Sequence, residues 1–392
     1  MIPMSYTSLR KSNRERAISE YELGAINLEC SPRILFVELT QNCNLHCRMC
    51  RSATRYDLNR DMPFPLFKRV ADELFPLAEI VDLRGHGEST MMPNFMDYVD
   101  YSLSFGCQLK LYTNLTKRDP NMWERLVASG FILAVSFDGA RTTTLETLRG
   151  GSKFWIIEQN LRLVVGYCQK HNCPADSVYL SCVVQNANLS EIPDLVEFTA
   201  NHGMRKLKIF PLIKNWSDPN HLHHNPEAIV SMLDKSFSRA RELGVSLELG
   251  ASLHHDLVIE SSVYSRCVHP WMVSLIDYRG RVSYCDHLIG DPKFVLGDLS
   301  IASFRSIWNS ERFRELREQH VSRRQDAFSG RFIDCEWCYR FRYTDYEHIL
   351  YPPQTNRLVS SQKTSAGYVH HAPDSLMNSA EPVEFRSKAH TW

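Results

Sequence analysis

The chain has 392 residues, of which 43% are hydrophobic, so it is long enough for one large α/β domain with an appendage or for two ordinary domains. Its 45 basic residues balance 45 acidic residues, which argues against a general nucleic-acid or membrane-surface binder. Residues 1–13 lack the apolar stretch of a signal peptide, and no run of roughly eighteen apolar residues follows. We therefore expect a soluble cytoplasmic protein with neither nucleic acid nor membrane as a partner.

Short apolar-rich segments alternate with helix-length segments from residue 34 to residue 213. This alternation, at about thirty residues per unit, predicts a parallel sheet with crossover helices. Six units favour an α/β fold of the partial (β/α)6 barrel type over the closed eight-fold form. The predicted strands are 34–40, 79–85, 108–114, 132–139, 177–185 and 206–213, and predicted helices between them include 66–75, 92–105 and 189–202.

The predicted strands carry polar residues on one face, although buried parallel strands are normally apolar on both. In the second strand, Val81 and Leu83 oppose Asp82 and Arg84. One interpretation is that some strands are misplaced or that one face is wet. We favour a hydrophilic barrel interior that surrounds a polar substrate. The other strands contribute to this face Glu38, Thr40, Lys110, Tyr112, Asn114, Ser136, Asp138, Lys206 and Lys208.

The pattern changes after the barrel. We predict a helix over 225–243, a strand over 245–249, a hairpin over 272–285, a helix over 301–319 and a cysteine-bearing loop over 331–339. From about residue 351 the composition is polar and without periodicity, which is typical of disorder. The predicted organisation is an N-terminal extension (1–33), the barrel (34–225), a connecting helix and strand (226–265), a second metal-binding domain (266–345) and a disordered tail (346–392).

Twelve cysteines in a cytoplasmic chain require an explanation, because disulfides are rare in that compartment. Seven of them form two spaced groups, which indicates metal binding or redox chemistry. The remaining five are scattered and receive no function, since buried free cysteine behaves as a small hydrophobe. They are Cys30, Cys107, Cys168, Cys173 and Cys182.

Cys43, Cys47 and Cys50 form the first group, in a loop directly after the first predicted strand. Active sites of parallel α/β barrels lie at this end of the strands. Three thiolates on one short loop can each bind a different iron of a [4Fe–4S] cluster and leave the fourth iron without a protein ligand. A zinc ion completed by His46 is the alternative, but the spacing matches paired zinc knuckles poorly.

The Cys-x-x-x-Cys-x-x-Cys motif after the first barrel strand resembles the radical S-adenosylmethionine (SAM) superfamily, over residues 34–213. The resemblance implies that the cluster binds SAM and, after accepting one electron, cleaves it to a 5′-deoxyadenosyl radical. It also implies an external one-electron donor of the flavodoxin or ferredoxin type.

Other positions match the superfamily residue by residue. Gly85-His86-Gly87-Glu88 resembles the glycine-rich turn that binds the SAM amino group, although His86 and Ser89 depart from the usual Gly-Gly-Glu-Pro. Ordinary loop capping is the alternative for any one polar residue at a strand end. The further SAM contacts that the resemblance implies are Met49 beside the adenine, and Asn114, Ser136, Asp138 and Gln185 at strand ends.

Cys267, Cys285, Cys335 and Cys338 form the second group. Four thiolates satisfy all the irons of a second [4Fe–4S] cluster, with zinc as a stronger alternative than at the first site. A cysteine, a hairpin with Gly-x-x-x-x-Cys, a helix and a Cys-x-x-Cys together resemble the SPASM/twitch extension of radical SAM enzymes. No cysteine follows Cys338, which favours the twitch form with one auxiliary cluster.

The polar barrel interior favours a small polar substrate such as a sugar, aminocyclitol or nucleoside. Lys208, Lys206 and Arg84, together with Lys110, are candidate substrate contacts for an anionic group such as a carboxylate, and a buried lysine can also donate a proton. The alternative is that acidic neighbours neutralise these cations in ion pairs. The acidic residues considered are Asp82, Glu38 and Asp138.

Two radical SAM groups then compete. The chain resembles cytosylglucuronate decarboxylases, and we predict radical decarboxylation of a nucleoside uronate in antibiotic biosynthesis, a lyase reaction. It is also similar to twitch-bearing dehydrogenases of aminocyclitols, in which an auxiliary cluster accepts an electron. A peptide-modifying maturase is a further alternative, disfavoured because about thirty-three residues precede the first strand, too few for a peptide-binding domain. A non-catalytic zinc or iron–sulfur protein would not cleave SAM.

Overall fold

The computed structural model describes residues 6–50, 60–212, 218–224, 226–249, 267–285, 292–322, 328–335, 363–364 and 367–368. The chain forms two units, residues 1–355 and residues 356–392. In the second unit, β11 (Lys363–Thr364) pairs with β12 (Gly367–Tyr368) in an antiparallel ladder. The rest of the predicted disordered tail lies outside the described residues, and the domain boundaries listed above stay predictions.

Six neighbouring parallel strands form the centre of the first unit, and they confirm the predicted α/β barrel strands. Their register places Leu35 beside Val81 and Leu111 beside Leu133. The carboxyl ends of all six therefore meet at one edge. The strands are β1 (Ile34–Val37), β2 (Ile80–Asp82), β3 (Gln108–Thr113), β4 (Ile132–Ser136), β5 (Val178–Val184) and β6 (Lys206–Pro211).

The sheet continues beyond both edges of this barrel. At one edge, β7 (Ser246–Leu249) runs parallel to β6. At the other edge, β8 (Val273–Ile276) runs parallel to β1 and pairs antiparallel with β9 (Arg281–Ser283), which pairs with β10 (Gly297–Asp298). The predicted hairpin and the predicted strand over 245–249 are therefore present. The hairpin, however, is part of the barrel sheet, a pairing between distant segments that local sequence patterns do not reveal.

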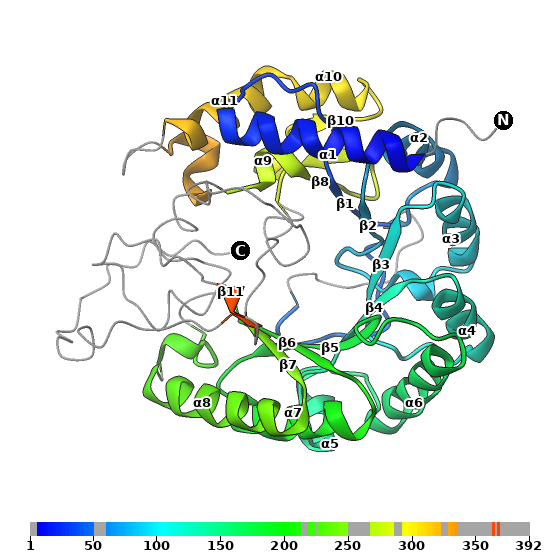
Figure 1. Ribbon diagram of the computed structural model, residues 1–392, viewed down its shortest axis with the longest axis vertical. Helices are drawn as coiled ribbons and strands as arrows, with labels where there is room; N and C mark the ends of the chain where they lie inside the picture. The colour runs from blue at the N-terminus through cyan, green and yellow to red at the C-terminus, as the bar shows by residue number, and fades with distance from the viewer. Residues whose placement is uncertain are drawn as a thin grey trace. The chain divides into compact units, whose positions relative to one another are not determined.

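Helices lie on the outer side of the curved sheet (Figure 1). In α2 the buried side chains recur every three or four residues, as expected for one face of a helix packed on a core. The predicted helices over 66–75, 92–105, 189–202 and 225–243 are confirmed, with a short 3-10 turn before three of them. The helices are α2 (Phe64–Leu74), α3 (Phe95–Leu103), α4 (Pro120–Ala128), α5 (Thr142–Leu148), α6 (Phe154–Lys170), α7 (Ile192–Asn201) and α8 (Pro226–Leu243).

One predicted helix is corrected. The segment 301–319 forms two helices, α10 (Phe304–Trp308) and α11 (Glu311–Val321), instead of one. Ser310 has extended backbone angles and precedes the first turn of α11, so the chain leaves and re-enters the helical conformation at this point. The sequence reading missed this break because serine is tolerated inside a helix as well as before one.

The N-terminal extension contains a helix that the sequence did not reveal, α1 (Tyr6–Leu23). Its apolar residues lack a clear helical stripe, which is the signal used for the other helices. The segment 25–30 after it contacts the C-terminal helices: Trp271 in α9 (His269–Met272), Trp308 and Arg317 donate hydrogen bonds of 2.8, 3.1 and 3.0 Å to its carbonyl oxygens. The segment between α1 and β1 therefore binds the C-terminal helices through its backbone carbonyls.

The two faces of the sheet differ as the sequence predicts. Leu83, Leu111 and Ile209 are fully buried in the hydrophobic core. On the opposite face, Arg84 lies 4.3 Å from the ring centres of both Phe36 and Tyr112, so side chains from β1, from β3 and from the segment after β2 meet there. Among the described residues, no helix is long and apolar enough to cross a membrane.

Candidate active site

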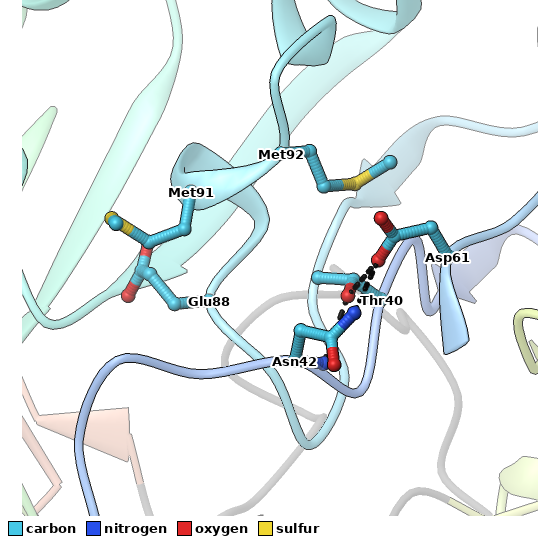
Figure 2. A pocket seen from close by; sticks show the side chains of 6 residues that line it. All are labelled: Thr40, Asn42, Asp61, Glu88, Met91 and Met92. Atoms are coloured by element: carbon cyan, nitrogen blue, oxygen red, sulfur yellow. Dashed lines mark hydrogen bonds between the residues drawn. The ribbon is translucent and has the colours of Figure 1, made fainter. Parts of the chain in front are cut away.

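The cysteine loop follows β1. The segment before the loop is held by hydrogen bonds to a residue that comes after it in the chain. Thr40 forms an antiparallel bridge with Asp61, and the Asp61 carboxylate accepts hydrogen bonds from the Thr40 hydroxyl and, at 2.9 Å, from the Asn42 side chain (Figure 2). Residues 51–59, between these anchors, lie outside the described residues. The anchors fix the start of the cysteine loop beside the segment that leaves it.

The glycine-rich turn packs against the backbone that leads into the cysteine loop. Gly87 donates a hydrogen bond of 3.1 Å to the Thr40 carbonyl, and Glu88 donates one of 2.8 Å to the Asn42 carbonyl. A Cβ added at Gly87 would lie 2.5 Å from the Asn42 oxygen, and one added at Gly85 would lie 2.1 Å from Cγ of Glu38. Both glycines are therefore required by contacts within the protein, whether or not they also contact SAM.

Glu38, which the sequence analysis considered as a partner of the interior cations, instead accepts hydrogen bonds within this turn. Its carboxylate takes one of 2.9 Å from the His86 backbone and one of 3.1 Å from the Gln41 side chain. Burial raises the pKa of Glu38 to about 7, against the effect of the His86 hydrogen bond, and the charge of Asp277 adds to the increase.

Glu88 joins the end of β2 to the end of β3. Its carboxylate accepts hydrogen bonds from the hydroxyls of Thr113 and Thr90, at 2.8 and 2.7 Å, and from the Asn114 backbone at 2.6 Å. Burial nevertheless raises its pKa. The predicted SAM contact of Glu88 stays a prediction, and its carboxylate already has three donors within the protein.

The cysteine loop rests on the turn that follows α5. His46 and Arg48 donate backbone hydrogen bonds, each of 2.9 Å, to the carbonyls of Gly150 and Leu148. A Cβ at Gly150 would lie 2.6 Å from the His46 ring, so the imidazole packs against backbone that has no side chain at this position. His46 therefore helps to hold the loop, and the glycine pair after α5 was a signal that the sequence analysis did not use.

Hydrogen-bond donors lie near the thiols of Cys43 and Cys47. The Leu45 backbone lies 3.4 Å and the Asn114 amide 3.9 Å from Sγ of Cys43, and Arg149 lies 4.0 Å from Sγ of Cys47. Such donors stabilise thiolates that bind iron. Burial raises the pKa of Cys43 to about 12, so the thiolate form depends on a bound metal.

The three thiols of the loop lie near one another. In a [4Fe–4S] cluster each thiolate binds a different iron, so the thiols surround one group without meeting at one atom. Cys43, Cys47 and Cys50 lie close enough for their charges to interact, as a shared cluster requires.

The remaining predicted SAM contacts lie at the same edge of the sheet. Ser136 ends β4, and Asn114 and Gln185 directly follow β3 and β5. Asn114 also donates a hydrogen bond of 2.9 Å to the Asn44 side chain in the cysteine loop. The side-chain nitrogen of Gln185 is buried and has no hydrogen-bond partner among the described residues. Met49 is half-buried within the loop itself.

Asp138 forms an ion pair that the sequence did not indicate. Its carboxylate lies 2.6 Å from Nε of Arg149 and accepts a hydrogen bond of 2.6 Å from the Val183 backbone. It does not neutralise the predicted interior cations, and its partner Arg149 was missed by the sequence analysis. Direct contact between Asp138 and SAM stays a prediction.

The second cysteine group lies around β8 and β9. Cys285 and Cys335 are buried, and the charges of Cys267 and Cys335 interact. Sγ of Cys267 lies 3.1 Å from Nδ1 of His269, and Sγ of Cys335 lies 3.5 Å from the Tyr284 hydroxyl. The fourth predicted ligand, Cys338, lies outside the described residues.

The predicted interior cations contact aromatic rings and acidic groups on the inner face. Arg84 lies 3.3 Å from Asp82, and Lys206 and Lys208 each lie 3.9 Å from a carboxylate oxygen of Glu248. Of the three predicted neutralising residues, Asp82 therefore does pair with a cation. Glu248 is a further partner, which the sequence analysis did not name because its strand, β7, was assigned outside the barrel.

Tyr112 and Tyr179 lie between these cations. Their hydroxyls are 3.3 Å apart, and Lys206 lies 4.4 Å from the Tyr179 ring centre. Burial acts to raise the pKa of Tyr112, but the neighbouring cations, Lys110 first, lower it below its ordinary value. The inner face thus offers paired charges and phenol hydroxyls as groups that can orient a polar substrate.

Comparison with known families agrees with the fold and both cysteine sites. Residues 37–199 match the profile of the radical SAM superfamily, and residues 267–339 match that of the SPASM iron–sulfur cluster-binding domain. The chain belongs to the radical SAM superfamily and carries a SPASM-type C-terminal domain. SAM and two [4Fe–4S] clusters are its implied cofactors, and the assignment of individual cysteines to these clusters stays a prediction.

Individual relatives are similar over most of the chain. A mycofactocin maturase (MftC) of Mycobacterium tuberculosis is 27% identical over 317 residues, covering 77% of this chain and 76% of that protein. The tungsten-containing aldehyde ferredoxin oxidoreductase cofactor-modifying protein of Pyrococcus furiosus is 24% identical and covers 73% and 83%. Streptococcus suis SuiB bound to precursor peptide SuiA has the same fold, with a TM-score of 0.60, 16% identity and coverage of 76% and 69%.

Replacing Gly87 by alanine tests the close approach of the two loops. The added Cβ would meet backbone oxygens that cannot move aside, so we expect the free energy of unfolding to fall by about 1–3 kcal/mol, with loss of bound iron. Denaturant unfolding under anaerobic conditions and iron analysis measure both effects.

Gly166→Ala is the matched control, because nothing lies within 4 Å of its added Cβ in α6. There alanine should stabilise the protein by about 0.5–1 kcal/mol. Equal effects of the two substitutions would show that the packing at Gly87 is not tight.

Glu38 gives a pH-dependent prediction. Its pKa of about 7 in the folded protein is above the ordinary glutamate value of 4.5, so between these two pH values the folded state binds a proton that the unfolded state lacks. The contribution of Glu38 to stability is therefore full below about pH 4.5 and is lost as the pH rises through 7.

Glu38→Gln keeps the side chain neutral at every pH. The free energy of unfolding of the variant relative to the unmodified protein should therefore rise between pH 5 and pH 8, by up to about 3 kcal/mol. Denaturant titrations across this range measure it, and a difference that does not change with pH would contradict the assignment.

Proposed function

We propose that this protein is a radical SAM maturase that modifies a peptide. The observation that carries the proposal is the 27% identity to a mycofactocin maturase over 77% of this chain. The fold similarity to SuiB, a protein whose structure holds a bound precursor peptide, supports it. The sequence alone favoured a small-molecule substrate over a peptide, and these relatives favour the reverse order.

The cluster at Cys43, Cys47 and Cys50 supplies, when bound, the electron that cleaves SAM. The chain's own residues fix the loop on two sides, through residues 85–88 and 148–151. The proposed SAM contacts remain those at the strand ends. Gln185 is the best supported of them, because its buried amide nitrogen has no hydrogen-bond partner in the described chain and an unpaired buried donor is costly.

Lys208, Lys206 and Arg84 are the proposed substrate contacts. They share the inner face with Tyr112 and Tyr179, next to the edge where the cysteine loop lies. Their positions allow them to hold carbonyl, hydroxyl or carboxylate groups of a substrate while the radical reacts elsewhere on it. An external one-electron donor of the flavodoxin or ferredoxin type completes the proposal.

Decarboxylation of a nucleoside uronate is the second candidate. The cluster of cations on the inner face favours it, because a carboxylate would be attracted there. The pairing of Arg84 with Asp82 and of the two lysines with Glu248 weakens this attraction. Dehydrogenation of an aminocyclitol has no comparable support from the arrangement of these residues.

One experiment separates the candidates. The protein with both clusters, reduced under anaerobic conditions with SAM, is incubated with the short peptides encoded beside its gene, or with a nucleoside uronate. We expect 5′-deoxyadenosine and a changed peptide mass, both lost when Cys43, Cys47 and Cys50 are replaced by alanine. Release of CO₂ from the uronate, with all peptides unchanged, would contradict the proposal.

Lys208→Met tests the substrate contacts. Loss of a hydrogen bond to a charged group costs about 1.5–3 kcal/mol, so we expect KM for the substrate to rise roughly ten- to a hundredfold. Cleavage of SAM without substrate should stay unchanged. Lys170→Met is the control, since Lys170 is exposed on α6 and pairs with Glu124 there. An unchanged KM in Lys208→Met would remove Lys208 from the substrate site.

A further inference from the structure

A buried ion pair lies against the cysteine loop. Nε of Arg149 and Oδ2 of Asp138 are 2.6 Å apart, and the exposed fractions of the two side chains are 11% and 0%. Burying two charges is costly unless their geometry is good and their remaining polar atoms are satisfied. The pair therefore calls for a functional reason beyond stability.

Both partners are held rigidly. The second carboxylate oxygen of Asp138 accepts a hydrogen bond of 2.6 Å from the Val183 backbone, and its carbonyl accepts one of 2.9 Å from Asn188. The Arg149 backbone donates a hydrogen bond of 2.8 Å to the Leu145 carbonyl at the end of α5. The backbone of Arg149 is therefore fixed, and the Asp138 carboxylate holds one edge of its guanidinium.

The free edge of the Arg149 guanidinium faces the cysteine loop. Its Nη1 lies 4.0 Å from Sγ of Cys47. The backbone hydrogen bonds from His46 and Arg48 to the turn around Arg149 keep the loop and the guanidinium together. A fixed positive charge thus stands beside one predicted cluster thiolate.

We propose that Arg149, held by Asp138, is a positioning residue that sets the reduction potential of the cluster bound by Cys43, Cys47 and Cys50. The potential of an iron–sulfur cluster depends on nearby charge and on hydrogen bonds to its sulfur atoms. The reduced cluster carries one more negative charge than the oxidised cluster. A cation beside Cys47 stabilises the reduced form, and a carboxylate beside it does the opposite.

The two members of the pair should therefore shift the potential in opposite directions. Arg149→Gln removes the cation and leaves the Asp138 carboxylate unpaired, so the midpoint potential should fall. Asp138→Asn leaves the cation unopposed, so the midpoint should rise. The double variant loses both charges, and its midpoint should lie between those of the single variants.

The test is a redox titration of the anaerobically reconstituted protein, followed by electron paramagnetic resonance of the reduced cluster, with iron counted per chain. The four auxiliary-site cysteines are replaced by alanine in every sample so that one cluster gives the signal. No peptide or other substrate is needed, so the outcome is independent of the proposed function. Arg141→Gln is the control, because Arg141 forms an exposed ion pair with Asp194 at 3.4 Å, away from the thiols.

Arg149→Lys keeps the charge and provides a second route if Arg149→Gln fails to bind iron. We expect the midpoint of Arg149→Lys to stay near that of the unmodified protein and that of Asp138→Asn to exceed it. A midpoint of Asp138→Asn at or below the unmodified value would overturn the proposal. Equal midpoints for Arg149→Gln, Arg149→Lys and the unmodified site would overturn it as well, and would leave the pair a structural element.

Discussion

The backbone contact between residues 38–42 and the turn 85–88 is the constraint on which the site depends. Gly87 and Glu88 donate hydrogen bonds to carbonyls in the segment that leads to Cys43, and Gly85 makes room for Glu38. One segment follows β1 and the other follows β2, and these two strands are paired in parallel. The contact between the segments therefore fixes the position of the cysteine loop relative to the sheet. The turn after α5 supports the same loop from the other side.

The barrel strands and both cysteine groups were predictable because each carries a local signal. Alternating apolar and polar residues mark the strands, and the spacing of Cys43, Cys47 and Cys50 is specific. The partners of polar residues at strand ends carried no such signal. From the sequence, Asp138 could equally be a ligand contact or one partner of an ion pair. No sequence pattern indicates that its partner is Arg149. The glycines at 85 and 87 were predicted to contact SAM, which stays a prediction, and the structure shows that the protein's own chain approaches both of them closely.

The attachment of the C-terminal domain was also beyond local sequence signals. The hairpin of β8 and β9 was predicted, but its parallel pairing with β1 joins segments more than two hundred residues apart. Local patterns do not specify such pairings. Their formation has an entropic cost, because a long segment of chain must close into a loop. The segment 25–30 reinforces the attachment by accepting hydrogen bonds from Trp271, Trp308 and Arg317. The two cysteine groups are therefore held by one continuous sheet.

The charges of the inner face bear on the choice of substrate class. In the sequence, the positive charges of Arg84, Lys206 and Lys208 on one predicted face favour an anionic substrate. The structure pairs Arg84 with Asp82 and both lysines with Glu248, so an incoming carboxylate would have to compete with carboxylates already present. A neutral amide or hydroxyl can accept a hydrogen bond from an ammonium group without separating it from its partner. A peptide presents many such groups, so a face of paired charges suits it at least as well as it suits a uronate.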